Sequence, residues 1–402
     1  MTTTTKKTVL LRGPLLTASG YGVHSRQIAR WLFRVAGEEH ALDITTECLP
    51  WGNTHLVLDP EAEDGLIGEI VQAASNKKDI YDVTIQVQLP NEWNPFLGQF
   101  NVGVTAGVET DRCNPDWVTC LNRMDLVVVP SEFTKQCFEA TGKVTTPVVV
   151  VPESFPDCLA DAEVVPPALD LGLTTRFNFL VVGQLTGTDI DNDRKNIPYT
   201  LKWFADTFAD CPDVGVILKT NGGANTQLDK QKVRATFSKL VGEITSPAAQ
   251  GPKFYLLHGH MTDEEMKGLY THRDIKALVS LGHGEGYGLP VLEAAVCGLP
   301  VVATNWSGYL DFMKFGKFVA VDRILTEVPP SRVDGQIFVK GAKWANPVEV
   351  DAKKRLRKFY ESPQIPTAWA KELSNKLKER LGFDGVAKAM SNVLAEHLLG
   401  SP

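Results

Sequence analysis

The chain has 402 residues, which is too many for one ordinary hydrophobic core and predicts two or three domains. Hydrophobic residues make up 43% of the sequence and charged residues 22%, a balance typical of folded globular proteins. The formal net charge of −7 provides no general basic field, which argues against a nucleic-acid-binding protein unless one local groove is basic.

Features of membrane and secreted proteins are weak in this sequence. The longest apolar runs, at 126–129 and 148–151, have the length of strands and are far too short to cross a bilayer, so we expect no transmembrane segment. No secretory signal precedes Thr8. The seven cysteines lack C-x-x-C spacing, which favours reduced thiols without a zinc ribbon. We therefore predict a cytoplasmic protein.

The first predicted unit combines an apolar run at 8–14, a glycine loop at 17–24 and a helical pattern at 25–35. A strand, a loop and a helix in this order open a nucleotide-type fold. The loop has neither the G-x-G-x-x-G spacing nor a Gly-Lys-Ser/Thr sequence, so neither a dinucleotide site nor a P-loop is predicted. A tight turn that requires small residues is an alternative explanation of its glycines.

Further apolar runs predict a parallel sheet covered by helices on both faces. They lie at 41–49, 83–89, 101–105, 125–129 and 148–151. Ligands bind at the carboxyl ends of the strands in such sheets, where Glu92, Trp93, Glu109 and Thr110 follow two of the runs. We predict that these residues face a ligand. Ser131, which follows another run, also suits the N-cap of the next helix.

Residues 156–176 contain prolines and no steady period, which predicts a linker between two domains. A second sheet begins at 177–185, and a helix is predicted at 197–209. Arg194 and Lys195 precede this helix, where adjacent cations oppose the helix dipole unless an anion lies close to them. A diphosphate would fit between them, and two solvated surface cations are the alternative.

The next strands end in polar residues. Lys219 closes a predicted strand at 214–220, and a following strand leads into His258-Gly-His260. Two histidines without a third ligand are weak support for a metal, so a hydrogen-bonding loop is the preferred interpretation. Thr262 then begins a capping-box sequence that opens a helix.

The most informative stretch, 279–305, has the pattern of a strand, a glycine loop at 284–288, a helix and a strand. Glycines let the backbone approach a ligand, and the loop opens onto a helix N-terminus, which suits a phosphate. Glu285 in the loop and Glu293 in the helix can accept hydrogen bonds from vicinal hydroxyls, which indicates a phosphate-linked sugar. An ordinary strand-to-helix turn with a solvated glutamate is the alternative.

The sequence Gly284-Glu-Gly-Tyr-Gly-Leu-Pro-Val-Leu-Glu293-Ala resembles the E-x7-E signature of retaining glycosyltransferases of family 4. The resemblance implies an α/β protein of the GT-B fold, with two Rossmann-like domains that face each other across a cleft. It implies an acceptor domain at 1–155, completed by a C-terminal helix at 383–402, and a nucleotide-sugar donor domain at 177–382. Residues on the acceptor side would be Glu92, Trp93, Glu109 and Thr110. The segments 85–93 and 305–311 resemble a branch of the family common in viral and bacterial genomes, and the protein would be located in the host cytoplasm if a phage encodes it.

The same resemblance implies roles for individual residues. Glu285 would contact the donor sugar, Lys195 would bind the distal phosphate with Arg194 beside it, and these three form the predicted catalytic set. Many relatives have an arginine where this chain has Gln184, and a histidine near the position of Glu109, where this chain has none. The predicted donor-binding residues are Gly20, Tyr21, Gly22, Gly183, Gln184, Lys219, Gly259, His260, Met261, Gly286, Tyr287, Gly288, Leu289 and Glu293, the last of them at the ribose.

The implied function is transfer of a sugar, with retention, from a nucleoside diphosphate sugar to a hydroxyl of a glycan, a small molecule or modified DNA. A UDP-sugar is favoured. No cofactor and no metal are predicted, although Asp189, Asp191 and Asp193 match a loose D-x-D metal pattern, because these carboxylates can offset the nearby Arg-Lys charge. Three alternatives stay open: a phage-type transferase that modifies a hydroxylated DNA base, a nucleotide-sugar 2-epimerase, and a non-catalytic nucleotide-sugar binding module.

Overall fold

The computed structural model describes residues 6–39, 42–52, 54–75, 77–185, 190–245 and 250–399. The chain divides into two compact units. Unit 1 consists of Met1–Val108, Arg112–Ser154 and Phe383–Pro402, and unit 2 consists of Glu109–Asp111 and Phe155–Gly382. The predicted linker, 156–176, therefore counts with unit 2, as does the short segment 109–111 that was expected in the first domain.

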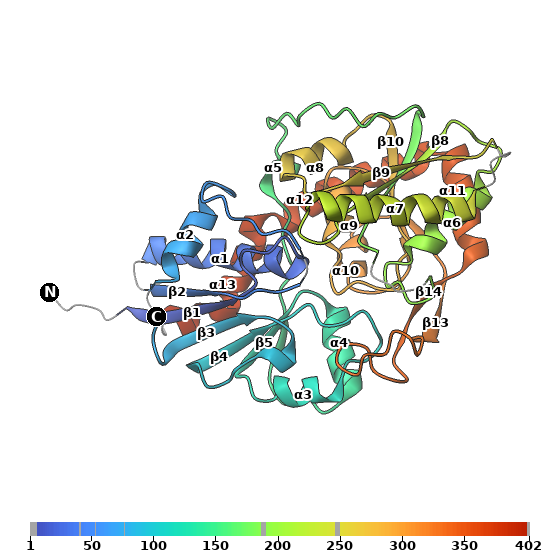
Figure 1. Ribbon diagram of the computed structural model, residues 1–402. Coiled ribbons are helices and arrows are strands. Elements are labelled where there is room, and N and C mark those ends of the chain that lie inside the picture. The colour runs from blue at the N-terminus through green and yellow to red at the C-terminus, as the bar shows by residue number, and fades with distance from the viewer. Residues whose placement is uncertain are drawn as a thin grey trace. The chain divides into compact units, whose positions relative to one another are not determined.

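Unit 1 contains a six-stranded parallel sheet with the strand order β2-β1-β3-β4-β5-β6 (Figure 1). Its strands are β1 (Lys7–Gly13), β2 (Leu42–Cys48), β3 (Tyr81–Val87), β4 (Gly98–Val104), β5 (Leu126–Val129) and β6 (Val148–Val150). Its helices are α1 (Gly20–Glu39), α2 (Leu66–Ala73), α3 (Pro115–Leu121), α4 (Glu132–Thr141) and α13 (Phe383–Leu399), with the short 3-10 helix η1 (Pro90–Glu92).

The last helix, α13, counts with unit 1 and packs against α1. The Trp31 indole donates a hydrogen bond to the Ser391 hydroxyl at 2.9 Å. The Arg30 guanidinium lies 3.9 Å from the centre of the Phe383 ring, a favourable cation–π contact. Met390 of α13 joins the same hydrophobic core as the strands, so this helix completes a fold that begins at the other end of the chain.

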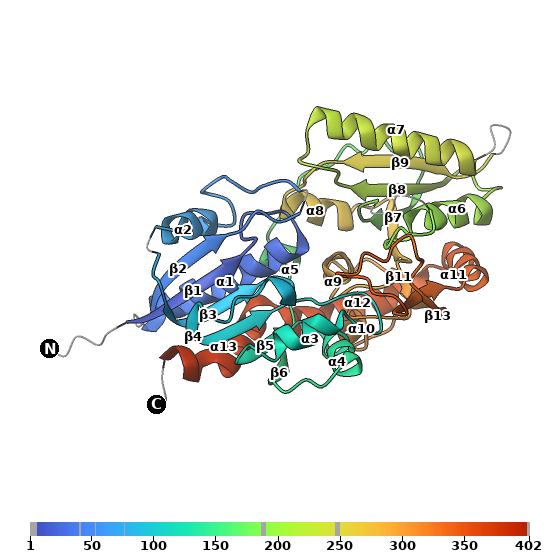
Figure 2. The ribbon, with the colours of Figure 1, turned by 60° about the horizontal axis from the view of Figure 1, so that its bottom comes forward.

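Unit 2 contains a second six-stranded parallel sheet, with the order β12-β11-β10-β7-β8-β9, and an antiparallel pair, β13-β14. Its strands are β7 (Phe177–Val182), β8 (Val214–Thr220), β9 (Lys253–His258), β10 (Ile275–Ser280), β11 (Val301–Thr304), β12 (Val319–Val321), β13 (Arg323–Glu327) and β14 (Lys343–Pro347). Its helices are α5 (Asp157–Ala160), α6 (Ile197–Thr207), α7 (Gln227–Ile244), α8 (Asp263–Tyr270), α9 (Leu289–Val296), α10 (Leu310–Met313), α11 (Glu349–Glu361) and α12 (Gln364–Leu381). Figure 2 shows α7 running along β9.

Both faces of the second sheet are covered, which explains the continuous apolar runs of its strands. Successive residues of a strand point to opposite faces. Leu180 and Leu278 join one hydrophobic core, whereas Phe179 and Ala277 join the other. Because the six strands are parallel, the loops that follow their carboxyl ends lie along the same edge of the sheet, and ligands of such folds bind at that edge.

The structure corrects one local prediction. The expected glycine loop at 20–22 is the first turn of α1, so the helix is longer than the pattern at 25–35 suggested. In the described part of the chain, no helix is both long and apolar enough to cross a membrane.

Candidate active site

Arg194 and Lys195 lie in a tight turn before α6. The next residue, Asn196, has a left-handed backbone with φ of 53°, a conformation that asparagine tolerates better than most residues. Its side-chain amide donates a hydrogen bond to the carbonyl oxygen of Leu281 at 2.9 Å. The carboxylate of Asp193 accepts the N–H of Ile197 at 2.9 Å and so caps the helix. The turn fixes the backbone of both cations.

Glu285 is held from two sides in the loop before α9. Its N–H donates to the Ser307 hydroxyl at 2.9 Å, and its carbonyl oxygen accepts the N–H of Gly308 at 2.9 Å. Ser307 has φ of 81°, which is rare for a residue other than glycine and is typical of functional sites. Gly288, the N-cap of α9, has φ of 97°, so the predicted need for a glycine there is confirmed.

Four charged side chains of unit 2 form a continuous chain of ion pairs. The Lys195 ammonium pairs with Glu285. The Arg194 guanidinium lies 2.6 Å from the Glu109 carboxylate and 3.9 Å from that of Glu285. These side chains are between 16% and 20% exposed, so water screens the charges only in part while a ligand can still reach them. We name this group the charge cluster: Glu109, Arg194, Lys195 and Glu285.

The charge cluster keeps its members ionised. Burial by itself raises the pKa of the Glu285 carboxyl, but Lys195 and Arg194 favour the carboxylate more strongly, so the pKa lies below its ordinary value. Burial opposes the charge on Arg194, while Glu109 and Glu285 raise its pKa above the ordinary value. Glu285 is therefore a hydrogen-bond acceptor at neutral pH and not a proton donor.

Glu109 takes a different place from the one expected. The sequence placed it on the acceptor side of the first domain, but its segment counts with unit 2 and its carboxylate binds Arg194. Space for this contact depends on Gly284, because a Cβ atom there would lie 2.5 Å from the carbonyl oxygen of Glu109. The carboxylates of Glu109 and Glu285 lie beside the two cations, where a diphosphate was predicted from the sequence.

Glu293 makes a separate polar contact. The buried Tyr270 hydroxyl of α8 donates a hydrogen bond to one oxygen of the Glu293 carboxylate at 2.9 Å. Burial raises the pKa of Glu293 to about 8, and this hydrogen bond opposes the rise. Among the described residues, no ion pair joins Glu293 to the charge cluster. The structure thus joins Lys195 and Glu285 in an ion pair, whereas Glu293 of α9 is hydrogen-bonded to Tyr270.

Lys219 fixes the loop between β9 and α8. Its side chain is 4% exposed, and its ammonium donates to the carbonyl oxygen of Gly259 at 2.5 Å and to the Asn221 amide oxygen at 3.1 Å. Burial lowers its pKa to about 8. The Nε2 atom of His258 accepts the N–H of Gly222 at 3.1 Å. In the described residues no group of three potential ligands could hold a metal ion.

Other predicted donor residues divide between backbone and surface positions. Tyr287 points into the core of unit 2, with its ring centre 5.2 Å from that of Phe312, so only its backbone is available to a ligand. Gly183 donates its N–H to the carbonyl oxygen of Lys219. The side chains of Gln184 and His260 are exposed, and Gly286, Leu289 and Met261 are half-buried.

The aspartates of the D-x-D pattern have structural partners. Asp189 lies outside the described residues. Asp191 accepts a hydrogen bond from the Tyr199 hydroxyl at 2.6 Å, and Asp193 caps α6. His283, which precedes the glycine loop, stacks on Trp344 with ring centres 4.2 Å apart, and its Nδ1 atom lies 2.8 Å from the carbonyl oxygen of Ala345. Asp191, Asp193 and His283 therefore hold neighbouring parts of unit 2 in place.

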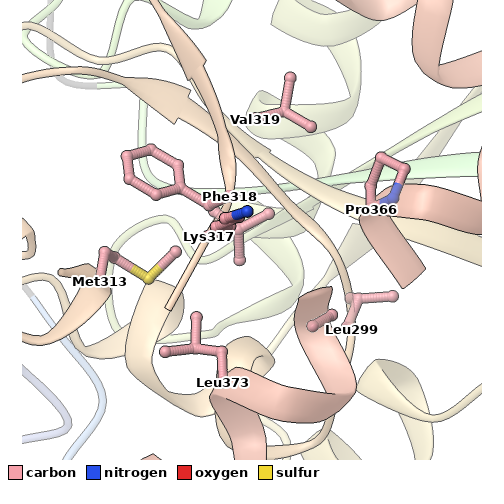
Figure 3. A pocket seen from close by; sticks show the side chains of 9 residues that line it. Leu299, Met313, Lys317, Phe318, Val319, Pro366 and Leu373 are labelled. Carbon is pink, nitrogen blue, oxygen red and sulfur yellow. The ribbon is translucent and has the colours of Figure 1, made fainter. Parts of the chain in front are cut away.

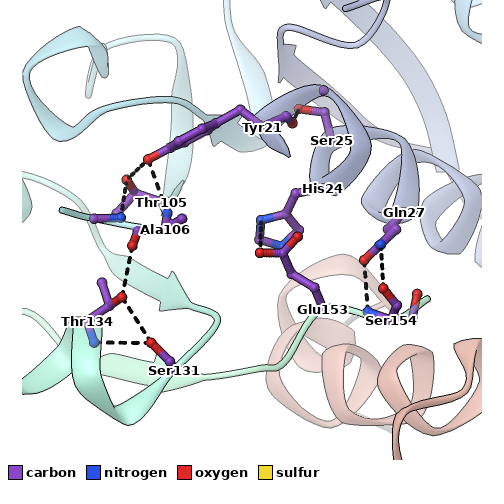
Figure 4. Close-up of polar contacts among 12 residues, drawn as sticks. Tyr21, His24, Ser25, Gln27, Thr105, Ala106, Ser131, Thr134, Glu153 and Ser154 are labelled. Atoms are coloured by element: carbon purple, nitrogen blue, oxygen red, sulfur yellow. Dashed lines mark hydrogen bonds and ion pairs between the residues drawn. The ribbon is translucent and has the colours of Figure 1, made fainter. Parts of the chain in front are cut away.

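The predicted residues of α1 serve the packing of unit 1. The Tyr21 hydroxyl lies 2.8 Å from that of Thr105 and accepts the N–H of Ala106 (Figure 4). A Cβ atom at Gly22 would lie 2.0 Å from the carbonyl oxygen of Thr17, so a small residue is required there, as the alternative interpretation proposed. Gly20, by contrast, has open space around it.

The remaining acceptor-side predictions are partly corrected. Trp93 is 8% exposed and its ring packs on Gly103, and Thr110 is fully buried, so neither side chain presents itself to a ligand. Ser131 caps α4, as expected, by accepting the N–H of Thr134 at 3.2 Å. Glu92 remains half-buried beside polar neighbours.

A small pocket of unit 2 is unrelated to the charge cluster (Figure 3). Its lining is nonpolar apart from Lys317. The lining residues are Leu299, Val301, Met313, Lys317, Phe318, Val319, Pro366, Ala370 and Leu373. No predicted site residue belongs to this set.

Several supporting residues had no clear signal in the sequence. Ser307 and Tyr270 position the two glutamates, and Asn221 completes the contacts of Lys219. The contacts of Ser307 and Tyr270 join residues that are more than 20 positions apart in the chain, so periodicity could not reveal them. The Asn-Trp-Ser-Gly sequence at 305–308 was the one available hint, because it promises an unusual turn after a strand.

Comparisons with known proteins address the whole arrangement. Residues 251–329, which include Glu285 and Glu293, match the family model described as glycosyl transferases group 1. The structure of HepE (Alr3699) of Anabaena in complex with UDP and glucose has a TM-score of 0.58 at 14% identity, and the similarity covers 97% of this chain and 100% of that chain. The sucrose-phosphate synthase (tll1590) of Thermosynechococcus elongatus gives 0.62 at 13% identity, over 98% and 100%. The chain has the GT-B glycosyltransferase fold.

The GT-B fold confirms the α/β class predicted from the sequence, and the group 1 match supports the resemblance carried by the E-x7-E motif. Among curated proteins, a phosphatidyl-myo-inositol mannosyltransferase of Propionibacterium freudenreichii subsp. shermanii is 35% identical over 85 residues. This match covers 20% of the chain and 21% of that relative, so the chain spans about a fifth of the relative's length.

Proposed function

We propose that this GT-B protein transfers a sugar from a nucleoside diphosphate sugar to a hydroxyl of an acceptor. The observation that carries the proposal is the charge cluster beside the glycine loop of unit 2, where Arg194 and Lys195 stand next to Glu285. Such cations suit a diphosphate, and an ionised carboxylate suits sugar hydroxyls. A UDP-sugar is the preferred donor, since HepE, which shares the fold, has been solved with UDP and glucose.

The chemistry follows from where negative charge develops. When the bond between the anomeric carbon and the phosphate oxygen breaks, the leaving diphosphate gains charge. Lys195 and Arg194 would stabilise this charge, which is commonly the largest electrostatic contribution to such reactions. Their present carboxylate partners mean that the donor must replace part of the existing ion pairing with its phosphates.

We propose that the transfer proceeds with retention and without a covalent intermediate on the enzyme. Glu285 is committed to Lys195, which makes it a poor nucleophile and a good hydrogen-bond acceptor. The departing phosphate oxygen can take the proton of the acceptor hydroxyl on the same face of the sugar. Glu293 would form hydrogen bonds with the ribose hydroxyls through the carboxyl oxygen that Tyr270 does not bind.

A thermal-shift screen followed by an activity assay tests the proposal. UDP, GDP, ADP and dTDP, each with and without a sugar, should give one clear class of stabilising ligand, because binding to the folded state raises the melting temperature. The stabilising donor should then be consumed with release of its nucleoside diphosphate. A protein that none of these nucleotides stabilises would contradict the proposal, and conversion of the donor to an epimer would favour a 2-epimerase.

A further inference from the structure

Unit 1 carries a second polar cluster, at the carboxyl ends of β1, β2 and β3. Arg12 closes the strand β1 and donates to Glu47 of β2 at 2.8 Å, to the Gln88 amide oxygen at 2.8 Å and to the carbonyl oxygen of Glu92 at 3.3 Å. The carboxyl edge of a parallel sheet is where ligands bind in this class of fold. We name this group, together with Trp51, the edge cluster: Arg12, Glu47, Trp51, Gln88 and Glu92.

Trp51 gives the edge cluster a fixed aromatic surface. Its indole N–H lies 3.4 Å from a carboxylate oxygen of Glu92, and its ring centre is 4.7 Å from that of Tyr21. Tyr21 is itself anchored through its hydroxyl to Thr105 (Figure 4). Trp51 remains half-buried, so part of the indole is open to a ligand while its orientation is set by two neighbours.

The polar members keep hydrogen-bonding capacity. The Glu47 side chain is 33% exposed, and its carboxylate is paired with Arg12 through one oxygen. One oxygen of Glu92 accepts the N–H of Leu89 at 3.1 Å, and the other makes a long contact of 3.4 Å with the indole N–H of Trp51. A carboxylate offers about four lone-pair positions, so both groups can accept further hydrogen bonds from hydroxyls.

The charges of this edge select the kind of ligand. Arg12 is neutralised by Glu47. Glu92 then leaves the edge cluster with an excess negative charge. Polyanions such as DNA need unneutralised cations for affinity, so this surface disfavours them. A sugar ring is neutral, offers many hydroxyl donors, and has a nonpolar C–H face that can lie on an indole.

We infer that the edge cluster is a binding subsite for a neutral carbohydrate, with Trp51 as the stacking surface and Glu47 and Glu92 as hydroxyl acceptors. Its role as the acceptor subsite rests on the proposed sugar transfer, but the binding itself does not. This assignment makes a glycan the acceptor class and makes modified DNA an outcome that the test would detect.

The experiment measures binding of the full chain to an array of neutral oligosaccharides, with sialylated and sulfated glycans and hydroxymethylated duplex DNA as anionic probes. The wild-type protein should bind neutral glycans, and Trp51→Ala should weaken that binding at least tenfold. Trp51→Phe should retain most of it, because a smaller aromatic surface remains. Trp369→Ala, which removes a partly exposed tryptophan of unit 2, is the matched control and should bind as the wild type does.

Three outcomes would overturn the inference: binding of anionic probes alone, no binding of any neutral glycan, or equal binding by the wild type and Trp51→Ala. The thermal shift with UDP, measured on the same samples, reports the donor site and the integrity of the fold. Absence of a thermal shift of the wild type with UDP, GDP, ADP and dTDP alike, with Trp51-dependent glycan binding retained, would contradict the proposed function only. A normal UDP shift with no glycan binding would contradict the inference only.

Discussion

The guanidinium of Arg194 lies 2.6 Å from the carboxylate of Glu109, a residue 85 positions earlier in the chain. One of the two cations proposed to bind the donor is therefore paired with a carboxylate of the protein itself. The neighbouring pair, Lys195 with Glu285, repeats the arrangement. Acidic side chains therefore compete with the diphosphate, and the strength of this competition can be measured.

Glu109→Gln should strengthen the binding of UDP by roughly three- to tenfold, because the diphosphate no longer displaces a charged partner from Arg194. Isothermal titration calorimetry of both proteins at the same ionic strength measures the change. Asp111→Asn, in the same short segment, is the control and should leave the dissociation constant unchanged. Weaker binding by Glu109→Gln would instead identify Glu109 as a residue that orients Arg194 for the donor.

Tyr270→Phe should weaken UDP binding several-fold, because the hydroxyl that fixes the Glu293 carboxylate is lost. The effect should depend on the ribose hydroxyls with which Glu293 is proposed to interact. Titrations with UDP and with its 2′,3′-dideoxy analogue provide this comparison within one variant. If the substitution weakened both ligands equally, Tyr270 would support the fold and not the ribose contact.

Glu293 should make stability depend on pH. Its pKa is about 8 in the folded protein, whereas the pKa of a glutamate in the unfolded chain is about 4.3. Between these values the folded protein holds a proton that the unfolded chain has released, so the free energy of unfolding decreases as the pH rises from 5 to about 8. In Glu293→Gln this contribution is absent, and the variant should become more stable than the wild type by on the order of a few kcal/mol at pH 8.

Urea denaturation of both proteins at pH 5, 6.5 and 8, followed by tryptophan fluorescence, measures this dependence. Glu264→Gln, at an exposed position of α8, is the control and should follow the wild-type profile. Parallel profiles for the wild type and Glu293→Gln would show that Glu293 carries no proton in the folded protein.

Turnover should not require a divalent cation, because Arg194 and Lys195 supply the charge that a metal would otherwise provide. Donor consumption measured before and after treatment with EDTA should remain equal within error. Restoration of activity by added Mg²⁺ or Mn²⁺ after a complete loss would contradict this expectation and redirect attention to Asp191 and Asp193.

The sequence was sufficient for the fold class, and it located the glycine loop and the Arg194-Lys195 turn on which the candidate site is built. Apolar runs located the strands because parallel strands buried on both faces are continuous in sequence, and the glycine loop with Glu285 carried the family resemblance. The sequence assigned Glu109 to the wrong unit. The segment 109–111 belongs to unit 2 although both flanking segments belong to unit 1, and no change in the sequence pattern marks these boundaries. The side chains of Trp93 and Tyr287 are buried, which the sequence did not indicate, because a pattern gives the path of the backbone but not the direction of each side chain.

The most direct test of the account is the rate of donor consumption by Lys195→Ala. The substitution removes the ammonium that pairs with Glu285 and is proposed to stabilise the leaving diphosphate, so kcat/KM should fall by about a hundredfold or more, equivalent to about 3 kcal/mol. Lys202→Ala, which removes an exposed lysine of α6 paired with Asp206, should retain wild-type turnover. Unaltered turnover by folded Lys195→Ala would contradict the proposal that the charge cluster binds the donor.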